Sequence, residues 1–90
     1  MVKLMAVHTL PYSNQEQMEA AGRELLKNMG KMPEGFNYKL TYCAFGDHKF
    51  FCDWDAPSKQ ALEGLFKQLS MPFDAVYPVK LFDMATQEWS

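Results

Sequence analysis

The segment HKFFCDWDAP, residues 48–57, places a thiol and two carboxylates among aromatic side chains. The thiol of Cys52 can ligate a soft metal ion, and Asp53 or Asp55 can orient a catalytic base. The candidate base is His8, because imidazole changes its charge near neutral pH. A strand, however, points successive side chains to opposite faces. We therefore expect Cys52 on one face and both acids on the other, where the three groups cannot readily bind one ion.

Two tyrosines extend this set, because Tyr38 and Tyr42 alternate onto one face of the segment FNYKLTYCAF, residues 36–45. Their hydroxyls could donate to an oxyanion that develops during a reaction. His8, Tyr38 and Tyr42 are therefore the predicted catalytic residues if the protein is an enzyme. The predicted ligand-binding residues share the tyrosine face, and they are Tyr38, Tyr42, Phe51, Asp53 and Asp55.

The cysteines, the methionines and His8 also have structural explanations. Cys43 and Cys52 lie diagonally across the predicted hairpin, but no CxxC pair is present. Free cysteine usually behaves as a small buried hydrophobe. The seven methionines are dispersed along the chain, which favours core filling over copper handling. A lone histidine on an apolar strand face is more often a hydrogen-bonded structural residue than a ligand.

Composition bounds the size and the partners of the protein. A chain of 90 residues with 48% hydrophobic residues suits one globular domain, residues 1–90. The net charge is −2 and the basic residues are scattered singly, which excludes the clustered cationic surface of a nucleic-acid-binding protein. The apolar runs are too short to cross a membrane, and the N-terminal segment lacks the features of a signal peptide. We therefore expect a cytoplasmic protein.

The hydrophobic periodicity predicts the element order βαββαβ, with strands over residues 3–10, 36–45, 48–55 and 75–84. The first helix is expected to begin at a capping box of Ser13 and Glu16 and to end at Gly30. The second is expected to begin at Ser58 and to end before Pro72. This order is the ferredoxin-like α+β plan, a four-stranded antiparallel sheet with two helices on one face.

Both faces of the predicted sheet are too apolar to meet water, yet the two helices can cover only one of them. The simplest cover for the open face is a second copy packed sheet to sheet. We therefore expect a homodimer through the open sheet face, a dimeric α+β barrel with a cavity between the subunits. The face with Tyr38, Tyr42, Asp53 and Asp55 is favoured for this cavity, because carboxylates are costly to bury beneath helices.

The segment FCDWDAPSKQALEGLFKQLSMPFDAVYPV, residues 51–79, resembles a known family. The family comprises small bacterial ferredoxin-like proteins of the nickel-responsive or nickel-binding type, within the wider dimeric α+β barrel superfamily. The matching motif residues are Cys52, Ala56, Pro57, Pro72, Asp74 and Val79. Asp55 stands where the family has Glu, and His8 ends the first strand as in the family. The resemblance implies the same fold, a homodimer, and a transition metal such as nickel near His8, Cys52 and Asp55.

Two departures from the family pattern argue against a simple transfer of nickel binding. The histidine of the family's second helix falls at Phe66, and the histidine of its Gly-His-Pro turn falls at Met71. Imidazole is a well-suited donor for nickel, so two important ligands would be missing. Nickel is thus the candidate cofactor that the resemblance implies, and the residues alone establish none.

Three functions remain open at this point. The first, which we favour, is a small dimeric α+β-barrel binding protein that holds a small ligand or a transition metal in the barrel cavity. The second is a cofactor-independent monooxygenase- or isomerase-like enzyme acting on a small aromatic or lactone substrate, with His8 as general base. The third is a protein-interaction module without a small-molecule site.

Overall fold

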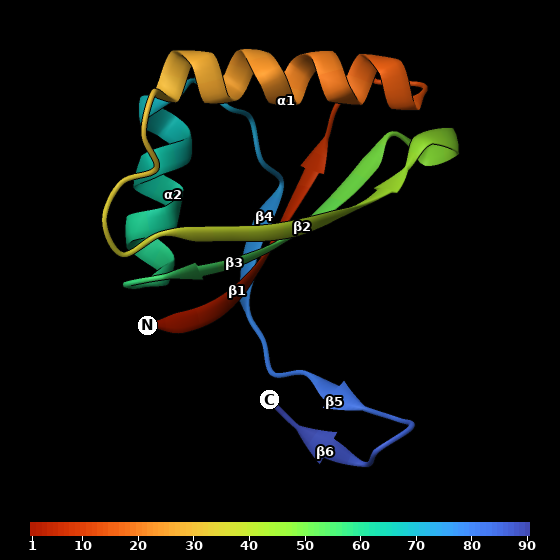
Figure 1. The fold of residues 1–90 in the computed structure, drawn as a ribbon, viewed down its shortest axis with the longest axis vertical. Coiled ribbons are helices and arrows are strands. Elements are labelled where there is room, and N and C mark those ends of the chain that lie inside the picture. The colour runs from red at the N-terminus through yellow and green to blue at the C-terminus, as the bar shows by residue number, and fades with distance from the viewer.

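The computed structural model describes all residues, 1–90, and confirms the predicted element order (Figure 1). Six elements make up the body of the molecule: β1 (Val2–Thr9), α1 (Gln15–Met29), β2 (Asn37–Ala44), β3 (Lys49–Ala56), α2 (Lys59–Gln68) and β4 (Ala75–Pro78). A short 3-10 helix, η1 (Phe45–Asp47), connects β2 to β3. Neither α1 nor α2 is long and apolar enough to cross a membrane.

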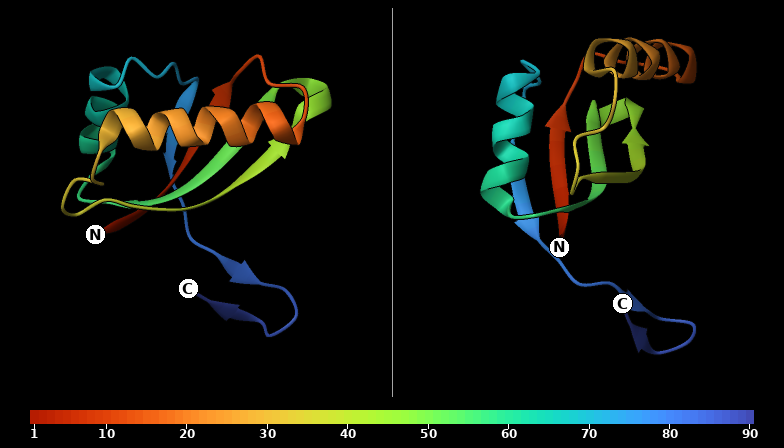
Figure 2. Two further views of the ribbon diagram at one scale, coloured as in Figure 1. Left: turned by 45° about the horizontal axis from the view of Figure 1, so that its top comes forward. Right: turned by 60° about the vertical axis from the view of Figure 1, so that its left-hand side comes forward.

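The four strands form one antiparallel sheet in the order β2-β3-β1-β4, with β1 and β3 in the centre. Three register pairs of the central strands supply the buried, helix-facing side: Leu4 with Trp54, Ala6 with Cys52, and His8 with Phe50. Helix α2 packs on this side, and α1 lies over it (Figure 2). The fold is therefore the ferredoxin-like α+β arrangement that the sequence predicts.

The two helices contact this side of the sheet unequally. Helix α2 buries Leu62, Leu65 and Phe66 in the core cluster that also contains Leu4 and Trp54. Helix α1 buries none of its residues. Full burial of one large apolar side chain contributes about 1.5–3 kcal/mol. Packing therefore fixes α2 firmly, whereas α1 stands over the sheet without closing onto it.

Strand β2 contains a bulge at Lys39, where the register shifts between Tyr38 and Leu40. A bulge adds one residue to a strand and so reverses the alternation of its side chains. Tyr38 consequently lies on the helix-facing side, where its ring stacks on Trp54 with 4.5 Å between centroids. Tyr42 lies on the open face and is exposed. The prediction that these two tyrosines share a face was wrong for this reason.

The fourth strand is shorter than the predicted range, residues 75–84. Strand β4 ends at Pro78, whose ring nitrogen cannot donate to a ladder. The residues that follow form a separate hairpin of β5 (Phe82–Asp83) and β6 (Glu88–Trp89). This hairpin extends away from the body of the molecule (Figure 1). Its apolar side chains, including Met84 and Trp89, are exposed.

Helix α1 begins one residue later than the capping box predicts. Asn14 is the N-cap, because its side-chain oxygen accepts a hydrogen bond of 2.9 Å from the Gln17 N–H. The Gln17 side chain accepts in return from the Ser13 N–H. The reciprocal pattern is present, but it uses Asn14 and Gln17 in place of Ser13 and Glu16. Ser58 caps α2 as predicted.

This shift can be measured. Asn14→Ala should lower the free energy of unfolding by about 1 kcal/mol, because it leaves a helix N–H without its acceptor. Ser13→Ala keeps the backbone N–H that Gln17 accepts from, so it should change stability by less than about 0.5 kcal/mol. Urea denaturation of both variants and the wild type measures the difference. A larger loss in Ser13→Ala than in Asn14→Ala would place the cap at Ser13 instead.

Candidate functional site

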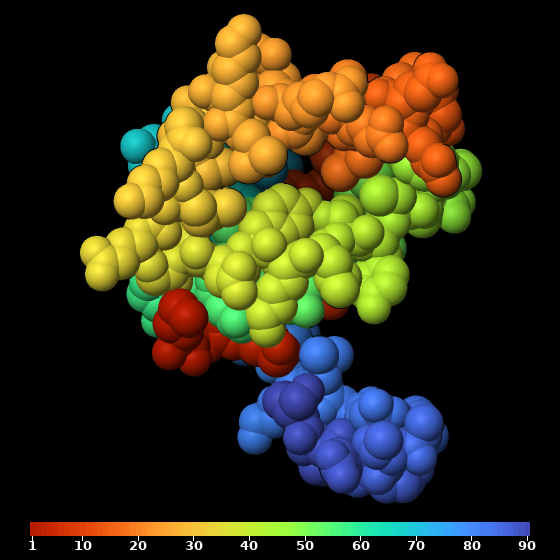
Figure 3. Space-filling view, viewed as in Figure 1, coloured from red at the N-terminus to blue at the C-terminus, as the bar shows by residue number.

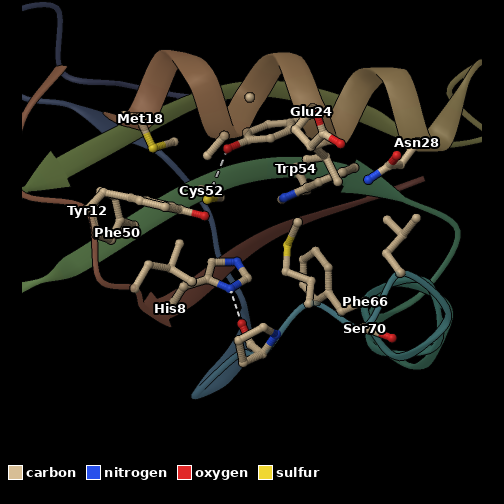
Figure 4. A pocket seen from close by; sticks show the side chains of 18 residues that line it. His8, Tyr12, Met18, Glu24, Asn28, Phe50, Cys52, Trp54, Phe66 and Ser70 are labelled. Atoms are coloured by element: carbon tan, nitrogen blue, oxygen red, sulfur yellow. Dashed lines mark hydrogen bonds between the residues drawn. The ribbon is translucent and has the colours of Figure 1, made fainter. Parts of the chain in front are cut away.

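A cavity of about 330 Å³ lies between α1 and the helix-facing side of the sheet. Twelve of its 18 lining residues are hydrophobic. The 18 lining residues come from β1, β2, β3, both helices, and the segments that follow β1 and α2 (Figure 4). In the space-filling view the surface is hollowed between α1 and β2 (Figure 3). This cavity lies within one chain on the helix-facing side, and the cavity expected between two subunits on the open face stays a prediction.

The roof of the cavity is the apolar stripe of α1, formed by Met18, Ala21, Gly22 and Leu25. The two residues in the middle of this stripe, Ala21 and Gly22, have the smallest side chains. A Cβ atom added at Gly22 would meet no other atom within 4 Å, although a glycine inside a helix costs about 0.8–1.0 kcal/mol relative to alanine. The stripe predicted from the sequence therefore faces empty space at its centre and leaves the cavity open.

His8 forms part of the cavity floor and is 1% exposed. Its Nδ1 lies 2.7 Å from the Pro72 carbonyl oxygen, which can only accept, so Nδ1 carries the proton and donates. The ring meets Phe66 edge-on, with 5.0 Å between centroids. In the neutral ring Nε2 is then an acceptor, and no group of the chain bonds it. Figure 4 shows this nitrogen pointing into the cavity.

The segment that carries Pro72 is tied to the end of β1. The Thr9 hydroxyl donates to Asp74 Oδ2 over 2.6 Å, and the Lys49 ammonium lies 3.3 Å from the same oxygen. The hydrogen bond from Thr9, assisted by Lys49, holds the pKa of the Asp74 carboxyl below its usual range. These contacts hold the Pro72 carbonyl against His8 and so fix the orientation of the imidazole ring.

Trp54 forms the opposite part of the floor and is 1% exposed. Its indole lies between Tyr38, on which it stacks, and Phe66, which it meets edge-on at 5.7 Å. The indole Nε1–H is buried and has no acceptor. Leaving a buried donor unpaired costs about 1–3 kcal/mol. Figure 4 shows Nε1 directed into the cavity, where a ligand could supply the missing acceptor.

Cys52 lies between these two groups and is part of a small polar network. Its sulfur lies 3.2 Å from the Tyr38 hydroxyl and 3.3 Å from the Thr41 hydroxyl, and the two hydroxyls lie within hydrogen-bond distance of each other, so the three groups share their protons in one network. Burial raises the pKa of the Cys52 thiol and also the pKa of Tyr38. Both groups are therefore neutral at pH 7, and Cys52 is not a ready thiolate ligand.

The structure separates the predicted metal ligands. His8 and Cys52 both line the cavity, whereas Asp55 lies on the opposite face of the sheet. No three His, Cys, Asp or Glu side chains come together anywhere in the chain. Phe66 and Met71, the positions at which the family pattern has imidazoles, line the same cavity. The residues of one chain therefore do not fit a nickel site.

The other predicted sets are separated in the same way. Of the proposed catalytic residues, His8 and Tyr38 line the cavity and Tyr42 does not. Of the proposed ligand-binding residues, Tyr38 alone lines it. The remainder lie on the open face, where a Lys39 ammonium lies 3.0 Å from Asp55 and the buried Asp53 Oδ1 has no partner.

Trp54 and Gly22 line the cavity, although neither was predicted from the sequence as a site residue. No sequence feature marks Trp54 as a site residue, because an aromatic residue on a strand with apolar residues on both faces is usually part of the core. Such a feature does mark Gly22: a glycine in the centre of an amphipathic helix stripe needs a packing or functional reason.

Comparison with known proteins agrees with the fold. A family model described as nickel responsive protein SCO4226-like matches residues 4–79. The structure is similar to the crystal structure of SCO4226 from Streptomyces coelicolor A3(2), with a TM-score of 0.67 and 18% sequence identity over 88% of this chain and 96% of that one. No curated protein matches the chain significantly. Residues 80–90, which include the hairpin of β5 and β6, lie outside the family match.

The two thiols should react at different rates. Cys52 is buried and hydrogen-bonded, and Cys43 is partly exposed. Because the thiolate must form and be reached, iodoacetamide at pH 8 should alkylate Cys43 more than about tenfold faster than Cys52. Mass spectrometry of the Cys43→Ser and Cys52→Ser variants measures each rate separately. A fast reaction of Cys52 in native protein would contradict the neutral, enclosed thiol described above.

Proposed function

The chain belongs to the family of nickel-responsive SCO4226-like proteins, and on that premise we propose that it is a non-catalytic binding protein for an organic small molecule. The ligand occupies the cavity between α1 and the sheet. The observation that carries this proposal is the apolar hollow of about 330 Å³ beneath a helix that buries none of its residues. Small-molecule sites are concave, mostly apolar, and about 300–1,000 Å³ in volume.

The chemistry of the lining supports an organic ligand better than a metal ion. Phe66 and Met71 supply apolar surface where the family pattern supplies imidazoles. His8 remains, but its Nδ1 is already bonded to Pro72. A single free imidazole nitrogen and a neutral thiol make a poor donor set for nickel, which imidazole and thiolate ligands suit. Any nickel site would therefore need donors from outside this chain.

The open face of the sheet supports a second element of the proposal, a homodimer formed through that face. Leu40, Tyr42 and Tyr77 are 45%, 63% and 55% exposed there, on the side away from both helices. Apolar patches of this kind mark interaction sites. The ligand cavity lies on the other side of the sheet, so each subunit of the dimer has a complete cavity.

Glycine replacements test the cavity. Gly22→Leu places a side chain in the empty centre of the cavity, and Gly64→Leu makes the same change on α2 outside it. Both replace a helix glycine with a better helix former and should favour their helices by slightly less than the about 0.8–1 kcal/mol that separates glycine from alanine. The uncharged fluorescent probe prodan should bind the wild type and Gly64→Leu, with a blue-shifted emission, but not Gly22→Leu. Equal prodan binding by the two variants would refute the cavity as the ligand site.

The homodimer is tested independently. The wild type at about 50 μM should have the mass of two chains by size-exclusion chromatography with light scattering, since stable interfaces bury apolar surface of this kind. Tyr42→Lys adds a charge to the open face and should give a monomer. Gln68→Lys adds the same charge to the end of α2 and should leave the dimer intact. A monomeric wild type would exclude the homodimer without affecting the cavity.

A further inference from the structure

The floor of the cavity presents two hydrogen-bonding groups that the protein itself leaves unused. Trp54 Nε1–H is a buried donor without an acceptor, and His8 Nε2 is an acceptor without a donor. Both rings meet Phe66, with centroid distances of 5.7 Å and 5.0 Å, so they flank one aromatic side chain. Figure 4 shows both nitrogens directed into the same cavity, so they are unpaired polar groups that a ligand in the cavity could bond.

The cavity does not favour a charged ligand. Among its lining residues, Glu24 is the one acidic side chain and no lysine or arginine is present. Glu24 is exposed and lies on α1, away from the floor. An ionised ligand would lose its hydration without gaining an ion pair, which is costly in an apolar site. An anion would also be repelled by Glu24. The site is therefore suited to an uncharged molecule.

The walls of the cavity favour a flat aromatic ligand. Tyr12 meets Phe50 edge-on at 5.9 Å, and Phe66 meets both His8 and Trp54 edge-on. Aromatic rings gain about 0.5–1.5 kcal/mol from such edge and face contacts beyond their area burial. The thioether of Met18 in the roof also packs favourably on aromatic rings. An aliphatic chain would forgo both kinds of contact.

We propose that the ligand is an uncharged, flat aromatic compound that carries a carbonyl-type acceptor and a hydroxyl or N–H donor. The acceptor bonds Trp54 Nε1–H, and the donor bonds His8 Nε2. This inference rests on the proposed function, because it specifies the ligand of the same cavity.

Flavone and its monohydroxy derivatives test this ligand class, with dodecanol as the aliphatic comparison and naphthalene sulfonate as the anionic one. Isothermal titration of wild-type protein should show binding of flavone, and the best hydroxyflavone isomer should bind about tenfold tighter because it adds one hydrogen bond to a buried partner. Dodecanol and naphthalene sulfonate should each bind at least about tenfold more weakly than flavone. Tighter binding of dodecanol or of the sulfonate would overturn the proposal.

A tryptophan replacement tests the donor directly. Trp54→Phe removes the indole N–H and keeps an aromatic ring, so flavone and hydroxyflavone should both bind about tenfold more weakly. Trp89→Phe makes the same change in β6, outside the cavity, and should leave both affinities unchanged. Unchanged flavone binding by Trp54→Phe would show that the indole does not bond the ligand. If Trp54→Phe fails to fold, the comparison of flavone, hydroxyflavone and dodecanol on the wild type still decides the ligand class.

The outcomes separate this inference from the proposed function. If prodan binds and Gly22→Leu excludes it, but flavones do not bind or Trp54→Phe has no effect, the cavity is a ligand site and the ligand class is wrong. If neither prodan nor any flavone binds the wild type, both proposals fail together.

Discussion

The unequal packing of the two helices is the constraint on which the rest of this structure depends. Helix α2 buries three large apolar residues on the sheet, and α1 buries none. A chain of this length buries only about two thirds of its unfolded surface, so an unclosed helix is a substantial loss of core. Gly22, which lines the cavity from α1, has room for an added Cβ atom without contact to any other atom within 4 Å. The side chains buried by α2 and the central strands therefore stabilise the fold, and a cavity remains beneath α1.

The order of elements followed from the sequence because it depends on long periodic segments, and the errors arose where one residue changes the geometry. The bulge at Lys39 moved Tyr38 to the helix-facing side, and nothing in the local composition marks a bulge. The same ambiguity divided the predicted ligand and catalytic sets between two faces. Asn14 replaced Ser13 as the N-cap because both residue types suit that position. The face on which a strand residue lies can therefore be predicted from the sequence only where the register of that strand can be predicted too.

The residues of the cavity floor are the basis for proposing an organic ligand in a member of a nickel-responsive family. The strand positions are kept, since His8 and Cys52 still lie on one side of the sheet. The surrounding positions differ from the family pattern, because Phe66 and Met71 supply carbon and thioether surface there. Thioether and neutral thiol groups are soft, weak donors, whereas nickel in proteins is well served by imidazole. The same scaffold then presents an apolar wall with two isolated polar atoms, which is the pattern of an organic ligand site.

Strand β3 connects the two proposed binding surfaces because its residues alternate between them. Cys52 and Trp54 face the cavity, while Phe51 and Asp53 face the open side of the sheet. The buried Asp53 Oδ1 has no partner on that side, just as Trp54 Nε1 has none on the other. The proposed ligand on one face and the proposed second copy on the other would both bind the folded strand and not the unfolded chain. Each of the two proposed partners would therefore stabilise the same central strand by mass action, and ligand occupancy would then contribute to the stability of a domain with a thin core.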